Sequence, residues 1–414
     1  MIYGIKNLIA SETGKDTGVV FIGTLTNVVV GGLFFIIAPR ILGPEQYGLF
    51  TIVLSTALMA VNFANFGIDT GILKFIKPNQ EEANNKTLKL AFKAYVAIGA
   101  LILAIGIFLS QPIAQLLNTP QITNLLRIAL GATIFTLLGN FFVAVLQTKR
   151  QFVKASIVNI SANILRLIIL LVASYFLTID LNFLTILVYS VTIIYVIVGK
   201  IFVPLNFLKA ENENIHFKNF FGYNFWIAAS LAISSIPFDN YLLVKIAGPI
   251  ATGLYAAPMK ILTTTYQFAG SYSRVLASRF SSFDSDTKAI EFAKKASTLV
   301  ILIFCGIILS NLIAPILVTI FGDEFQPSVP IFRILTIGMA FFFADTVPMS
   351  LILYYFGKSK IAFYVTIWHY AIYLMLLLYF IPKYSATGAA VAFTASEIVT
   401  FFTLTSYVVF KFKK

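Results

Sequence analysis

The chain has 414 residues, of which 59% are hydrophobic and only 11% are charged. Such a chain has too little polar surface to cover a soluble globule of this size, so a water-soluble fold is excluded. Its formal net charge is +13. This excess needs no nucleic-acid partner in a membrane protein, because basic residues gather beside the anionic lipids of the inner leaflet.

Apolar runs long enough to cross a bilayer follow one another along the chain. About 20 residues at about 1.5 Å per residue span the hydrocarbon core. Residues 1–16 include Glu12 and Asp16 and have no small-residue cleavage site, so we expect no signal peptide. The twelve runs lie at 17–39, 48–68, 90–110, 125–147, 156–177, 181–200, 220–247, 251–272, 297–321, 329–356, 361–381 and 387–410.

The lysine and arginine residues alternate between the two sides of these runs. With the N-terminus in the cytoplasm, 22 of the 30 basic residues fall on the inner side. Only Arg40, Lys245 and Lys383 fall on outer loops. The positive-inside rule therefore favours twelve helices with both termini in the cytoplasm.

One short motif occurs twice. "RILGPEQYGLF" at residues 40–50 returns as "KIAGPIATGLY" at 245–255, and Arg127 and Arg333 belong to a second pair with nearly the same offset. Gly-Pro favours a tight turn. A preference for turns does not explain why the members of two different motif pairs are separated by nearly the same number of residues. We therefore expect an all-α integral membrane protein with two parallel six-helix lobes around a central cavity. The predicted lobes are 1–205 and 206–414.

The amino-acid sequences of these motifs resemble those of a known family. "PRILGPEQYGLF", "DNYLLVKIAGPIATGLYAAPMKI" and "ATGAAVAF" (386–393) resemble the polysaccharide-transport and O-antigen-type flippases of the multidrug/oligosaccharidyl-lipid/polysaccharide exporter superfamily. The resemblance covers essentially the whole chain. It implies a bacterial or archaeal inner-membrane protein that moves a polyprenyl-pyrophosphate-linked oligosaccharide to the outer leaflet by alternating access. It also implies membrane lipids, a polysaccharide polymerase and other assembly proteins as candidate partners.

Polar stripes inside the predicted spans indicate where such a cargo would bind. A charge at the bilayer centre costs about 2.5–3.5 kcal/mol on insertion scales, so it requires a partner or a purpose. Arg166 and Lys260 are the two basic residues at mid-depth, and fixed cations suit a pyrophosphate. The alternative is that each pairs with a buried carboxylate and only locks helices together. The candidate cavity residues are Arg166, Asn159 and Asn163, then Lys260, Thr264 and Gln267, and Asn27 on the first helix.

Three acidic residues inside the second half are candidates for ion coupling. They are Asp239, Asp345 and Glu397. Pro237 is expected to kink the helix beside Asp239 and free backbone carbonyls, an arrangement suited to H⁺ or Na⁺. Equally, Asp239 could pair with Lys245 or Lys260. We expect no cofactor beyond such an ion and no metal site.

Other classes of protein fit the sequence less well. An enzyme would need catalytic carboxylates or histidines on a substantial outer loop, but the longest predicted outer connection, 111–124, has no charge. A multidrug or cation antiporter of the same superfamily is the main alternative, although it would favour acids over Arg166 and Lys260 at mid-depth. A lipid scramblase is a third class and needs no central charges. His369, between Trp368 and Tyr370, could relay protons as a buried histidine, but it is interpreted as a packed, hydrogen-bonded residue.

Overall fold

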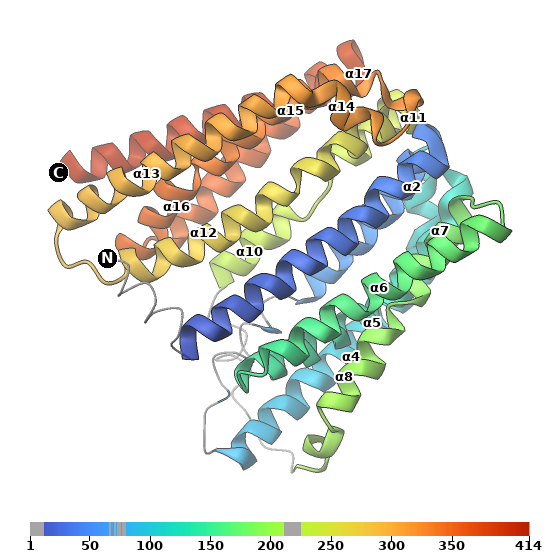
Figure 1. Ribbon diagram of the computed structural model, residues 1–414, viewed down its shortest axis with the longest axis horizontal. Helices are drawn as coiled ribbons and strands as arrows, with labels where there is room; N and C mark the ends of the chain where they lie inside the picture. Colours follow the sequence, from blue (N-terminus) through green and yellow to red (C-terminus); the bar gives the residue numbers. More distant parts are fainter. Residues whose placement is uncertain are drawn as a thin grey trace. The chain divides into compact units, whose positions relative to one another are not determined.

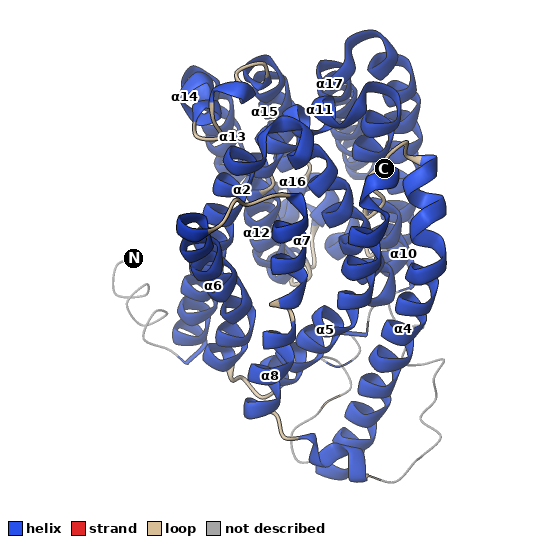
Figure 2. Cartoon of the chain, turned by 90° about the vertical axis from the view of Figure 1, so that its right-hand side faces the viewer, coloured by secondary structure: helices blue, strands red, loops and turns tan. Residues whose placement is uncertain are grey.

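A computed structural model describes residues 12–65, 68, 69, 72, 76, 80–210 and 225–413. Within these residues every regular element is helical and there is no strand (Figure 2). Nine helices of this described part are long and apolar enough to cross a membrane. The helical membrane class predicted from composition is thus confirmed, because a helix satisfies all its backbone groups internally in lipid.

The chain forms two compact units. The first consists of residues 1–38 and 53–225, and the second consists of residues 39–52 and 226–414. The first copy of the repeated motif, 40–50, therefore packs with the second unit. The division into six-helix lobes at 205 stays a prediction.

The first unit is built from helices that pack around aromatic side chains. Phe141 on α5 contacts both Phe92 on α4 and Phe207, with ring centroids 5.4 and 5.5 Å apart. Helix α4 continues to Leu116, into the stretch that was expected to be an outer connection. The helices are most of α2 (Glu12–Asn65), then α4 (Glu81–Leu116), α5 (Thr123–Thr148), α6 (Phe152–Phe176), α7 (Leu181–Ser190) and α8 (Ile193–Phe202).

The second unit contains the remaining helices. Helices α13, α15 and α17 lie side by side (Figure 1), and α11 also packs on α15 and α17. A π-helical stretch, Leu351–Tyr355, separates α16 from α17. The helices are α10 (Phe225–Ser234), α11 (Phe238–Leu262), α12 (Thr264–Phe280), α13 (Asp286–Leu309), α14 (Ala314–Thr319), α15 (Ser328–Ala344), α16 (Thr346–Ser350) and α17 (Ser359–Lys413).

Three of the long helices contain a single non-helical residue. Gly43 interrupts α2 with φ 68° and ψ 173°, Gly248 interrupts α11 with φ 85° and ψ 175°, and Ser385 interrupts α17 with φ 54° and ψ −131°. Each break lies between two of the predicted spans. The backbone angles at Gly43 and Gly248 are open almost only to glycine, which explains why Gly-Pro occurs at both. The count of twelve spans stays a prediction.

The two copies of the repeated motif pack against each other. A Cβ on Gly48 would lie 2.0 Å from the Pro249 carbonyl oxygen, and a Cβ on Gly253 would lie 1.9 Å from the Pro44 carbonyl oxygen. The contact is reciprocal, because the glycine of each copy meets the proline carbonyl of the other. The motif is therefore repeated for a structural reason, since each copy forms half of a close backbone contact.

We expect Ser385→Gly to stabilise the protein. Ser385 has a left-handed φ of 54° that costs a side-chain-bearing residue about 1–3 kcal/mol, whereas the extra unfolded-state entropy of glycine costs about 0.5–1 kcal/mol. The net gain should be about 1 kcal/mol, measured as a higher midpoint of thermal unfolding in detergent. A matched Ser278→Gly change in the exposed, regular part of α12 should lower the midpoint. A lower unfolding midpoint for Ser385→Gly would show that the backbone at Ser385 is not strained.

Candidate functional site

Three of the predicted cavity residues form one hydrogen-bonded cluster in the first unit. Arg166 on α6 is only 9% exposed, and its Nη2 donates to Asn163 Oδ1 at 2.6 Å. Asn163 Nδ2 in turn donates to Asn27 Oδ1 on α2 at 2.6 Å. Asn159 lies one turn earlier on α6 and is half-buried. The predicted polar stripe of α6 therefore faces α2.

The guanidinium of Arg166 packs on aromatic rings. Its central carbon lies 4.2 Å from the centroid of Phe34 and 5.4 Å from that of Phe35. Such a desolvated cation–π contact contributes about 2 kcal/mol. Arg166 Nε is buried without a hydrogen-bond partner, and no described carboxylate forms an ion pair with Arg166. The alternative of a carboxylate lock therefore has no partner for Arg166 among the described side chains, and it stays open for the rest of the chain.

The second predicted stripe runs from the end of α11 into α12. Lys260, in the last turn of α11, is half-buried. The Thr264 hydroxyl donates to the Ile261 carbonyl at 2.7 Å, whereas the Gln267 side chain is exposed. The hydroxyl hydrogen of Thr264 is thus used within its own helix, whereas the amide of Gln267 is accessible. A site that joins Arg166 to Lys260 stays a prediction.

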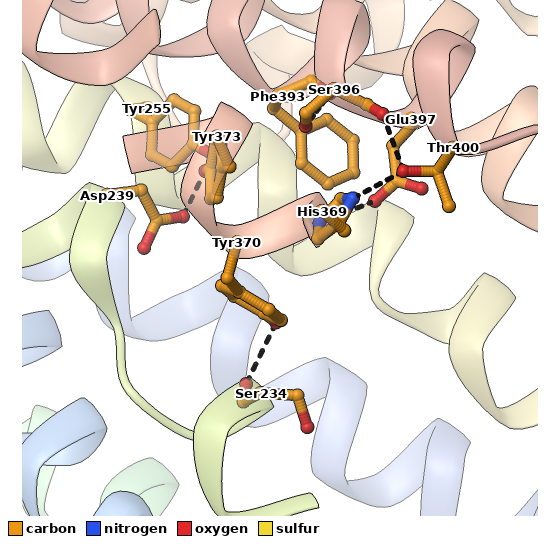
Figure 3. A network of polar contacts seen from close by, with 10 residues as sticks. All are labelled: Ser234, Asp239, Tyr255, His369, Tyr370, Tyr373, Phe393, Ser396, Glu397 and Thr400. Carbon is orange, nitrogen blue, oxygen red and sulfur yellow. Dashed lines mark hydrogen bonds and ion pairs between the residues drawn. The ribbon is translucent and has the colours of Figure 1, made fainter. Parts of the chain in front are cut away.

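Asp239 lies at the first turn of α11, directly after the predicted interruption. Helix α10 ends at Ser234 and α11 begins at Phe238, with Pro237 between them. Asp239 Oδ1 accepts from the backbone N–H of Asn240 at 2.8 Å, and Oδ2 accepts from the Tyr255 hydroxyl at 2.9 Å. The Tyr255 and Tyr373 hydroxyls are 3.4 Å apart (Figure 3). The carboxylate is therefore held by a tyrosine pair from α11 and α17.

The other two acids are buried near one another in the second unit. Asp345 is 9% exposed and its Oδ1 has no hydrogen-bond partner. Glu397 is 5% exposed, and its Oε1 lies 3.8 Å from His369 Nε2. Asp345 and Glu397 also interact electrostatically. The His369 ring was predicted to be packed and hydrogen-bonded, and its Nδ1 lies 2.8 Å from Thr400 Oγ1 (Figure 3).

Sequence reasoning missed the partners of these acids. Tyr255, Tyr373 and His369 were not among the predicted site residues. One signal could have found His369: His369 and Thr400 are placed almost symmetrically about Ser385, the break in α17. Residues at equal distances from the turn of an antiparallel hairpin lie opposite each other, so the pairing follows once the turn is located.

The fold and these polar clusters define the class of protein: a multi-span helical membrane protein with charged groups buried inside its helix bundles. A family model for "polysaccharide biosynthesis protein" matches residues 13–284. The chain therefore belongs to this family, and the resemblance carried by the repeated turns is confirmed. A "putative O-antigen transporter" from Shigella flexneri is 24% identical over 391 residues, covering 87% of this chain and 89% of the relative.

Solved structures show the same fold. An inward-facing multidrug-resistance MATE family transporter of the MOP superfamily superposes with a TM-score of 0.77 at 13% identity, covering 94% of both chains. The lipid II flippase MurJ, in an inward closed conformation, gives a TM-score of 0.75 at 16% identity, covering 94% of this chain and 87% of MurJ. The chain thus has the helical fold that these transporters share.

Proposed function

We propose that this protein is a flippase that moves a polyprenyl-pyrophosphate-linked oligosaccharide, a precursor of a cell-surface polysaccharide, from the inner to the outer leaflet. Transport proceeds by alternating access and is coupled to an ion. The protein is a transporter and not an enzyme. Membership of a polysaccharide biosynthesis family supports the cargo class, and the likeness to an O-antigen transporter supports the transport step.

The observation that carries this proposal is the buried guanidinium of Arg166. It is desolvated, bonded through Nη2 to Asn163 alone, and has no carboxylate partner among the described residues. A buried cation without a permanent counter-ion can bind an anionic cargo reversibly. The oxygens of a pyrophosphate would replace the water that burial removed from the guanidinium. Lys260 of the second stripe supplies the second positive charge.

The proposed topology follows from the charge pattern. Twelve transmembrane helices form an N-lobe at 1–205 and a C-lobe at 206–414, with both termini in the cytoplasm and the protein in the inner membrane. The basic residues on the inner side support this orientation. The polymerase and assembly proteins of the same polysaccharide are the proposed protein partners.

A multidrug or cation antiporter is the second candidate function. The buried carboxyl groups of Asp345 and Glu397 and the partly buried carboxyl group of Asp239 favour it, since acids rather than bases attract an organic cation. The two functions differ in what crosses the membrane. Efflux of ethidium from vesicles, with no delivery of lipid-linked oligosaccharide, would favour the antiporter.

The test of the flippase is delivery of a labelled lipid-linked oligosaccharide to the outer leaflet of proteoliposomes, divided by the amount of protein. Arg166→Ala should reduce delivery about 10- to 100-fold, because a hydrogen bond to a charged group contributes about 1.5–3 kcal/mol. Arg166→Lys retains the charge but not the bidentate geometry, so it should reduce delivery less. Lys260→Ala should resemble Arg166→Ala.

Arg127 provides the matched control. It also bonds to an asparagine three residues earlier, with Nη1 3.1 Å from Asn124 Oδ1, on α5 of the same unit. Arg127→Ala should leave delivery per molecule unchanged. Normal delivery by both Arg166→Ala and Lys260→Ala would reject the anion site. A loss of protein amount alone would show that these two residues only support the fold.

A further inference from the structure

We propose that His369 and Glu397 form a proton-binding pair that takes up and releases the ion coupled to transport. This inference rests on the proposed function, because it identifies the coupled ion and its carrier. Both residues belong to α17, one on each side of the break at Ser385, and their side chains face each other (Figure 3). Their side chains are 13% and 6% exposed, so each is nearly removed from water.

The tautomer of His369 is linked to the direction of its hydrogen bond with Thr400. The Thr400 hydroxyl has one hydrogen, and it donates this hydrogen to the Ser396 carbonyl at 2.8 Å. The same oxygen lies 2.8 Å from His369 Nδ1, so it accepts from Nδ1 when the hydroxyl donates to the carbonyl, and Nδ1 then carries the proton. In the neutral ring, Nε2 is then an unprotonated acceptor that faces Glu397.

His369 and Glu397 together bind one proton. Glu397 Oε1 lies 3.8 Å from Nε2, and a shift of about 1 Å would bring the atoms to hydrogen-bond distance. The proton resides either on the carboxyl group, which leaves both groups neutral, or on the ring, which gives an ion pair. Release of the proton to water leaves a buried carboxylate beside a neutral imidazole. That state is costly in a bilayer, so it should exist only while the site is open to water.

The titratable groups around Glu397 favour binding of a proton by this site. Asp345 interacts electrostatically with Glu397, and its Oδ1 is buried without a partner. Two buried carboxylates so placed disfavour each other's ionised form. Other titratable or charged groups on the packed elements include Asp239, Tyr241, Lys245, Tyr255 and Lys260 on α11, Tyr266 on α12, Arg333 on α15, and Tyr370 and Tyr373 on α17.

A metal cation fits this place less well than a proton. Among the described residues, no group of three or more His, Cys, Asp or Glu side chains could hold a metal ion. The atom that faces Glu397 is an imidazole nitrogen, whereas Na⁺ is a hard cation, the kind that selects oxygen ligands. A basic nitrogen opposite a carboxyl oxygen is instead the arrangement in which a proton is exchanged.

The first experiment needs no cargo. Purified full-length protein is titrated while infrared difference spectra record the carboxyl and imidazole bands. In the wild type, a carboxyl band and an imidazole band should change together, because they report one shared proton. Glu397→Gln should remove that carboxyl band and shift the imidazole midpoint by at least one pH unit, and His369→Gln should shift the carboxyl midpoint. Unchanged midpoints in both variants would overturn the pair.

The second experiment tests the coupling. In proteoliposomes, a pH gradient should accelerate delivery of labelled lipid-linked oligosaccharide by the wild type at least tenfold, and this acceleration should disappear in Glu397→Gln and in His369→Gln. Glu291→Gln, which removes an exposed carboxylate bonded to Lys295 on α13, is the matched control and should respond as the wild type does. Thermal unfolding checks that each variant is folded.

The outcomes separate this inference from the proposed function. Delivery that proceeds in Glu397→Gln with its full pH response would overturn the proton pair and leave the flippase intact. Delivery that a Na⁺ gradient drives and a pH gradient does not would also overturn it. Absence of delivery by the wild type would reject the flippase, while the infrared titration would still support or overturn the shared proton.

Discussion

Gly253→Ala should destabilise the second unit severely. The new Cβ would lie 1.9 Å from the Pro44 carbonyl oxygen and 2.8 Å from its carbonyl carbon. These are backbone atoms, so no side-chain rotation relieves the clash. Overpacking costs about 1–3 kcal/mol, and we expect the upper end. At roughly 2–4 °C per kcal/mol for a domain of 150–250 residues, the unfolding midpoint should fall by about 6–12 °C.

Gly48→Ala should have the same effect, because its Cβ would lie 2.0 Å from the Pro249 carbonyl oxygen. The double variant should cost less than the sum of the single variants, since the first alanine already separates the two turns. Gly306→Ala on α13, where no atom lies within 4 Å of the new Cβ, is the control and should gain about 0.5–1 kcal/mol. A wild-type midpoint for Gly253→Ala would refute the close contact.

This reciprocal contact shows what sequence could and could not predict. The repeat of Gly-Pro at nearly constant offset predicted two turns of one kind, and the positive φ at Gly43 and Gly248 confirms them. The sequence did not predict that Gly48 and Gly253 face the other copy's proline, because a contact between segments about 200 residues apart leaves no local pattern. The helical breaks were local and predictable, whereas their mutual packing was not.

In the candidate site, too, contacts within one helix could be predicted from the sequence, whereas contacts between separate helices could not. The spacing of Asn163 and Arg166 placed both on one face of α6, since residues three apart on a helix are neighbours, and their hydrogen bond confirms this. The contact of Arg166 with Phe34 comes from another helix, so no local spacing indicates it. The same holds for Tyr255 and Asp239, which are 16 positions apart with the Gly248 break between them.

The end of α2 carries a further polar cluster, which joins it to α4. The Tyr95 hydroxyl lies 2.6 Å from Asn65 Oδ1 and also contacts Asp69 Oδ1. Asn65 Nδ2 donates to Asp69 Oδ2 at 2.8 Å. Burial raises the pKa of the Asp69 carboxyl above its ordinary value, and the hydrogen bonds from Tyr95 and Asn65 partly oppose this rise. Tyr95 itself is fully buried, so its hydroxyl has no water to replace these partners.

Tyr95→Phe should therefore destabilise the first unit in a pH-dependent way. A carboxyl group whose folded pKa is raised stabilises the fold fully below its unfolded pKa, near 4, and this contribution is lost as pH rises through the folded pKa. The hydroxyl of Tyr95 donates a hydrogen bond that lowers the pKa of Asp69, and the variant removes it. The pKa of Asp69 in the folded variant is therefore higher still, so the variant loses more folding stability than the wild type as the pH rises. We expect a cost of about 1 kcal/mol at pH 4 and a larger cost at pH 7, rising toward the roughly 1.5–3 kcal/mol that a hydrogen bond to a charged group contributes.

The measurement is the free energy of unfolding in detergent at the two pH values for the wild type and the variant. Tyr175→Phe is the control, because Tyr175 on α6 of the same unit is 85% exposed and its hydroxyl should contribute less than about 0.5 kcal/mol at either pH. A Tyr95→Phe cost that is equal at pH 4 and pH 7 would mean that the hydroxyl acts only through Asn65. A cost that is larger at pH 4 would reverse the sign expected from a buried carboxylate and would reject the role given to Asp69.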